Sequence, residues 1–111
     1  MLPAMAVAGA PRAKDEINHL LDYTQQSGCQ FNRNGTWYSA VEARDHLQKK
    51  YAYLVKKGWI TKAEDFIERA ATKSSMSGRA YQVKCGNESQ KSTPGWLTDE
   101  LKRYRKNKNT D

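Results

Sequence analysis

The sequence predicts an α+β domain in which about four helices pack around a small antiparallel sheet, made of a hairpin plus one strand, with one disulfide. Apolar residues recur at helical spacing in four segments and alternate at strand spacing in others. An Asn-Gly pair between two strand-like runs is typical of a tight hairpin. A length of 111 residues is enough for one hydrophobic core, so we expect a single domain.

Four segments carry the apolar spacing of a helix with one buried face. They cover residues 14–27, 40–57, 62–72 and 93–104. Gly28 follows the first of them and is expected to end it in a left-handed conformation.

Capping signals mark where three of these helices begin. The spacing of a capping box occurs twice, at Ser39 with Glu42 and at Thr61 with Glu64. In a capping box, the side chain of each residue accepts a hydrogen bond from the backbone N–H of the other. Thr93-Pro94 places proline in the first turn, where its missing N–H costs nothing.

Two runs predict the sheet. Asn34-Gly35 predicts a two-residue turn in which both residues have positive φ, with strand residues on either side. Residues 79–85 alternate, with Tyr81, Val83 and Cys85 on one side.

The two cysteines, Cys29 and Cys85, each lie in one of these strand-like runs. In a small exported domain such a pair is expected to form a structural disulfide, which would contribute about 4 kcal/mol by restricting the unfolded chain. The alternative is two buried free thiols in a cytosolic protein. If the pair joins adjacent antiparallel strands, Phe31 lies opposite Val83 and Arg33 approaches Tyr81.

The predicted organisation has three parts. Residues 1–13 are interpreted as a signal-peptide remnant or a flexible N-terminus, because small apolar residues give way abruptly to charged ones. Residues 14–104 form the α+β domain, and residues 105–111 form a basic flexible tail. Together with the cysteines, this predicts a periplasmic or secreted protein, and no stretch is apolar enough for a membrane span.

The order of these motifs resembles a family of short exported bacterial proteins catalogued only as a domain of unknown function. The matching residues extend from Glu16 to Arg105 and include Ser27-Gly28-Cys29, Phe31, Arg33-Asn34-Gly35, His46-Leu47, Ser77-Gly78, Tyr81, Val83, Cys85 and Trp96-Leu97. The resemblance implies an exported bacterial domain with a single disulfide. It implies no activity and no functional residue.

The net charge is +7, and residues 102–108 contribute five cations without an acid. Lys102, Arg103, Arg105 and Lys106 are therefore a candidate anion-binding tail, in which Tyr104 would stack on a nucleic-acid base. The alternative, which we favour, is a helix end whose cations complement the helix dipole, so nucleic acid is not the expected partner.

A second candidate binding surface is the rim, defined as Arg33, Asn34, Ser77, Arg79 and Tyr81. The predicted strand register places the Asn34-Gly35 turn and the Ser77-Gly78 loop at the same end of the sheet. The rim would suit an acidic protein or an anionic envelope component. The rival interpretation is two simple turns with solvated arginines.

No catalytic motif, cofactor motif or metal-ligand set is evident, so we expect a non-enzymatic binding module with no cofactor and no metal. His19 follows Asp15 by one helical turn, and His46 follows Glu42 in the same way. This spacing is more typical of surface ion pairs than of a metal or acid–base site. Ser74, Ser75 and Ser77 lack the context of a nucleophile. One alternative function remains: residues 77–81 are similar to the Ser-Gly-x-x-Tyr loop of periplasmic lysozyme inhibitors.

Overall fold

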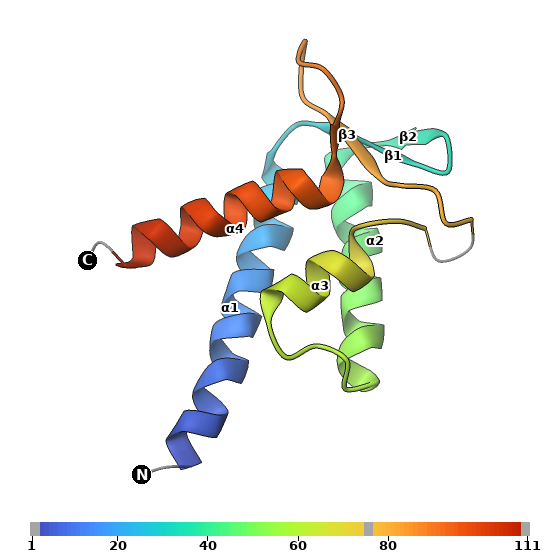
Figure 1. The fold of residues 1–111 in the computed structure, drawn as a ribbon. Helices are drawn as coiled ribbons and strands as arrows, with labels where there is room; N and C mark the ends of the chain where they lie inside the picture. Colours follow the sequence, from blue (N-terminus) through green and yellow to red (C-terminus); the bar gives the residue numbers. More distant parts are fainter. Residues whose placement is uncertain (1–2, 75–76, 110–111) are drawn as a thin grey trace.

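The computed structural model describes residues 3–74 and 77–109. It confirms the α+β fold, with three helices gathered beneath a sheet and the fourth helix running out from one edge (Figure 1). The elements follow one another as α1 (Pro3–Gln26), β1 (Gln30–Arg33), β2 (Thr36–Tyr38), α2 (Ala40–Lys56), α3 (Ala63–Ala70), β3 (Gln82–Lys84), β4 (Lys91–Ser92) and α4 (Thr93–Asn109).

The sheet is antiparallel with the strand order β2-β1-β3-β4. Phe31 lies opposite Val83, as the sequence predicts, and the Cys29–Cys85 disulfide joins the strands beside this pair. Asn34 and Gly35 both have positive φ, at 56° and 85°, which confirms the turn between β1 and β2. The predicted disulfide is thus confirmed over the alternative of two free thiols.

Strand β4 was not expected, and β3 is shorter than the predicted run. β4 has two exposed polar residues, so it carries no alternating pattern that would reveal it. The predicted strand over residues 79–85 is reduced to Gln82–Lys84, because Ala80 pairs instead with Lys73 in an isolated bridge.

The core lies where α1, α2 and α3 meet the inner face of the sheet. α1 contacts all three other helices, and Phe66 from α3 is completely buried among them. Burial of such side chains is the main stabilising contribution in a domain of this size. The larger buried side chains of this core are Ile17, Leu20, Leu21, Phe31, Leu47, Leu54, Phe66, Ile67, Val83, Trp96, Leu97 and Leu101.

The first and last helices extend beyond the segments predicted for them. α1 begins at Pro3 rather than Lys14, in keeping with the strong helix propensity of its alanines. α4 continues to Asn109, so the segment expected to be a flexible tail from residue 105 is helical over most of its length. Met1 and Leu2 lie outside the described residues, and the interpretation as a signal-peptide remnant stays a prediction.

The caps of α2 and α3 differ in how well the sequence predicts them. Ser39 and Glu42 form the expected capping box at α2. At α3, Asp65 rather than Glu64 accepts the hydrogen bonds of the Thr61 backbone and hydroxyl, each at 2.9 Å. Glu64 takes no part in this cap and binds Arg105 instead.

Candidate functional site

The rim residues come together at one end of the sheet. The Ser77 hydroxyl donates a hydrogen bond to Asn34 Oδ1, which links the two loops directly. Arg79 lies against Gly35, where an added Cβ would stand 3.3 Å from its Nη1. The two loops therefore share one end of the sheet, as the strand register predicts.

Tyr81 differs from the other rim residues because it is buried rather than exposed. Lys50 Nζ donates to the Tyr81 hydroxyl oxygen at 3.2 Å, which leaves the hydroxyl proton for His46 Nε2, also at 3.2 Å. Tyr81 thus fixes two side chains of α2 against the sheet. Its hydroxyl is engaged within the chain, so the similarity of residues 77–81 to an inhibitor loop gains no support from this position.

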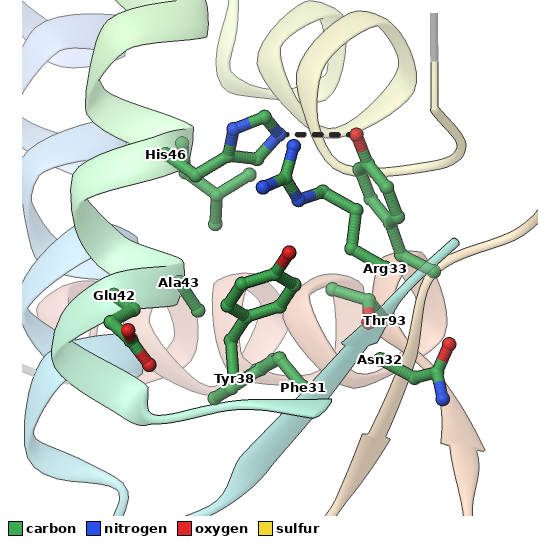
Figure 2. A pocket seen from close by; sticks show the side chains of 10 residues that line it. Phe31, Asn32, Arg33, Tyr38, Glu42, Ala43, His46 and Thr93 are labelled. Carbon is green, nitrogen blue, oxygen red and sulfur yellow. Dashed lines mark hydrogen bonds between the residues drawn. The ribbon is translucent and has the colours of Figure 1, made fainter. Parts of the chain in front are cut away.

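Arg33, His46, Lys50 and Tyr81 form what we call the basic cluster. Arg33 lies over the Tyr38 ring at 4.8 Å, and Figure 2 shows its guanidinium beside the His46 imidazole. Lys50 lies 5.1 Å from the centre of the Tyr81 ring. Neither Arg33 nor Lys50 forms an ion pair within the described residues.

The electrostatics of the basic cluster follow from burial and from the neighbouring cations. Burial, followed by the charges of Arg33, Lys50 and Lys49, lowers the pKa of His46 to about 4. Burial, followed by the charge of Arg33, also lowers the pKa of Lys50. His46 is therefore neutral at pH 7, and the cluster presents two cations to an incoming group.

A small hollow opens beside the basic cluster, between the sheet and the start of α2 (Figure 2). Its volume is about 40 Å³, and most of its wall is apolar. Thr93 from the first turn of α4 also borders it, and the buried Thr93 hydroxyl makes no hydrogen bond within the described residues. The residues around it are Phe31, Asn32, Arg33, Tyr38, Glu42, Ala43, His46, Leu47, Tyr81 and Thr93.

A wider groove of about 680 Å³ lies on the other side of His46, between α2 and α3. Two exposed aromatic rings border it, Tyr53 and Trp59, and Arg69 lies 5.6 Å from the centre of the Trp59 ring. Its cations outnumber its one acid, Glu68; they are Lys49, Lys50, Arg69 and Lys73. The positive surface of the rim therefore continues along α2.

The contribution of α2 to this site was not predicted from the sequence. Lys49, Lys50 and Tyr53 follow His46 at intervals of three, four and seven residues, which places all four on one face of a helix. That spacing is the signal from which the site could have been predicted.

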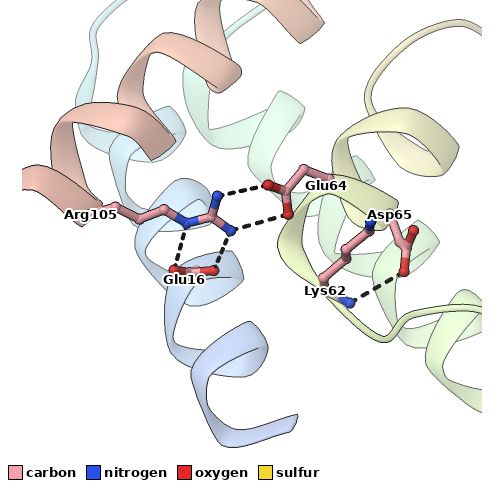
Figure 3. A network of polar contacts seen from close by, with 5 residues as sticks. All are labelled: Glu16, Lys62, Glu64, Asp65 and Arg105. Atoms are coloured by element: carbon pink, nitrogen blue, oxygen red, sulfur yellow. Dashed lines mark hydrogen bonds and ion pairs between the residues drawn. The ribbon is translucent and has the colours of Figure 1, made fainter. Parts of the chain in front are cut away.

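The candidate anion-binding tail does not form a comparable cluster. Arg105 binds Glu16 Oε2 at 2.8 Å and Glu64 Oε2 at 2.7 Å, so it bridges three helices (Figure 3). Arg103 binds Glu100 at 2.6 Å. Lys102 and Lys106 are exposed and form no ion pair within the described part of the chain. Two of the four predicted cations thus have carboxylate partners inside the molecule.

The histidine–acid pairs predicted along the helices are not formed. His19 binds Glu100 at 2.6 Å and stacks on Tyr104 with ring centres 4.0 Å apart, and Glu42 caps α2 instead of binding His46. Within residues 3–74 and 77–109, no three side chains of the His, Cys, Asp and Glu types are grouped as a metal site.

The serine-rich loop is held by its own hydrogen bonds. The Ser77 hydroxyl accepts from the Arg79 backbone as well as donating to Asn34. Ser74 is buried, and Ser75 lies outside the described residues.

The fold and the site together define a class: a disulfide-linked α+β domain with a basic surface at one end of its sheet. None of the helices, over the residues described, has the length and apolar character needed to cross a membrane. A model of the family described as "Family of unknown function (DUF5329)" matches residues 11–105, and the chain belongs to that family. No curated protein and no solved structure matches the chain.

Proposed function

We propose that the protein is a non-enzymatic binding module that holds an anionic envelope or extracellular partner through the rim and the basic cluster. The observation that carries the proposal is the convergence of Arg33, Lys50 and Arg79 at one end of the sheet, with no carboxylate partner among the described residues. Arg33 and Lys50 are also partly buried, where an unpaired charge is costly to the folded chain, and an anionic partner would offset that cost.

Export from the cytoplasm is part of the proposal. The Cys29–Cys85 disulfide supports it, because structural disulfides persist in oxidising compartments such as the periplasm and the extracellular space. The bacterial origin implied by the resemblance, and the signal-peptide remnant interpreted from residues 1–13, belong to the same proposal.

The test compares two double variants that remove the same charge. Arg33→Gln with Arg79→Gln changes the rim, whereas Lys102→Gln with Lys106→Gln changes the exposed cations of α4. Binding to poly-glutamate and to heparin is measured by calorimetry at fixed ionic strength, since such affinities depend on salt. The two probes separate an acidic protein from an anionic glycan.

We expect the rim variant to bind the preferred probe at least about tenfold more weakly, because charge-assisted hydrogen bonds are lost. The α4 variant should bind within about twofold of the unmodified protein. Equal losses of affinity in the two variants would mean that binding depends on net charge alone. A larger loss in the α4 variant would place the site on that helix.

A further inference from the structure

We propose that the hollow beside Arg33 is a binding site for a carboxylate group on a short apolar stem. The inference rests on the proposed function, which it deepens by naming the chemical group that is recognised. The hollow shares Arg33 and Tyr81 with the rim but reaches inward from it, between the sheet and α2.

The size and lining of the hollow set the kind of group that fits. A volume of about 40 Å³ accommodates roughly three water-sized atoms or groups. Phe31, Ala43 and Leu47 line its inner wall, and all three are buried apolar side chains. A short hydrocarbon stem would be favoured there. A fully hydrated ion would be disfavoured, because its water molecules would face apolar carbon atoms without hydrogen-bond partners.

Arg33 supplies the recognition of the charged end. Its guanidinium carbon lies over the Tyr38 ring, 4.8 Å from the ring centre. The paired N–H groups of a guanidinium match the two oxygens of a carboxylate. No carboxylate within the described residues already occupies them.

The other polar groups around the hollow are consistent with a single negative charge. Glu42 borders the hollow, but its carboxylate accepts from the Ser39 backbone at 2.9 Å and points away from Arg33 in Figure 2. Thr93 also borders the hollow, and its buried hydroxyl has no hydrogen-bond partner among the described residues. Lys50, held on Tyr81, adds a second positive charge behind the histidine.

The test is a nuclear magnetic resonance titration of the oxidised full chain with propionate, at constant ionic strength. Propionamide, which has the same shape without the charge, is the matched control. Resonances of Arg33, His46 and Thr93 should move with propionate and saturate, and propionamide should move them far less. Two further ligands distinguish the source of the carboxylate: acetyl-Ala-Ala with a free C-terminus, and acetyl-Glu-amide.

Two variants connect the titration to the hollow. Arg33→Gln should weaken propionate binding at least about tenfold while the protein stays folded, because the side chain is only half-buried. Ala43→Leu should fill the hollow and weaken binding similarly. Val41→Leu, on the exposed side of the same helix, is its control and should bind normally.

Equal shifts with propionamide, or unchanged binding by Arg33→Gln, would overturn the inference. If propionate causes no saturating shift while poly-glutamate or heparin binding still depends on Arg33 and Arg79, the inference fails and the proposed function stands. If propionate binds in the hollow but neither polymer depends on the rim, the proposed function fails instead.

Discussion

Arg105 and Arg33 carry the same charge but have opposite surroundings. Arg105 is bonded to two carboxylates, Glu16 and Glu64, where α1, α3 and α4 meet. Arg33 lies on an aromatic ring beside a neutral histidine, and no acid among the described residues is bonded to it. The charge of a basic residue therefore does not by itself reveal its role. The role depends on whether the fold supplies a counter-charge.

The two regions are also held together differently. The sheet end has the Cys29–Cys85 disulfide in addition to its backbone hydrogen bonds. The helix junction, which we define as Glu16, Glu64, Glu100, Arg103 and Arg105, is joined by ion pairs. The first kind of link is insensitive to salt, and the second is weakened by it.

The largest expected effect is loss of the disulfide. Cys29→Ser with Cys85→Ser should lower the free energy of unfolding by about 4 kcal/mol, because the unfolded chain regains the freedom of a long closed loop. Urea denaturation at low ionic strength and in about 0.5 M salt measures this loss of stability. The difference should be the same in both solutions. A loss of less than about 1 kcal/mol would contradict the role given to the covalent link.

The next effect concerns the helix junction. Arg105→Gln should lower the free energy of unfolding by about 2–3 kcal/mol, because the buried Glu16 carboxylate loses its hydrogen-bonded partner. Glu64→Gln is the control and should cost less than about 1 kcal/mol, since Glu64 is half-exposed. If both variants lose the same free energy of unfolding, the burial of Glu16 does not determine how much Arg105 stabilises the junction.

These two predictions show how unevenly the sequence reveals the two regions. The turn at Asn34-Gly35, the cysteine pair and the alternation over residues 79–85 are local or pairwise signals, and they predict the sheet register and the placement of the rim. The partners of Arg105 come from three helices far apart in sequence, so no local pattern indicates them.

The same limit applies within the candidate site. The rim residues could be predicted from the turn and the loop beside it. The contacts of His46 and Lys50 with Tyr81 depend on how α2 crosses the sheet, which the spacing of apolar residues does not specify. Burial of Tyr81, rather than exposure, follows from that crossing.

A smaller effect tests the electrostatics of the basic cluster. The pKa of His46 is about 4 in the folded protein, below the ordinary value of 6.5, so between these values the unfolded chain binds a proton that the folded chain does not. Stability should therefore fall as the pH is lowered from 6.5 to 4. His46→Gln should reduce that slope, whereas the contributions of the carboxylates, including Glu42 and Glu64, stay the same. Denaturation curves at several pH values measure the slope, and equal slopes would contradict a neutral His46.

The smallest effect is expected where a cation is exposed and unpaired. Lys102→Gln with Lys106→Gln should change the free energy of unfolding by no more than about 0.5 kcal/mol. Thermal denaturation of the variant beside the unmodified protein measures this. A larger loss would mean that these lysines stabilise the end of α4.

The most direct measurement compares Arg33→Gln with Arg105→Gln, which remove the same charge. Both unfolding free energy and affinity for the preferred polyanion are measured for each variant. We expect opposite losses: Arg105→Gln loses about 2–3 kcal/mol of stability and keeps its affinity, whereas Arg33→Gln keeps its stability within about 0.5 kcal/mol and binds more weakly. If Arg33→Gln is the less stable protein, or if Arg105→Gln loses the greater share of affinity, the division between binding and structural cations is wrong.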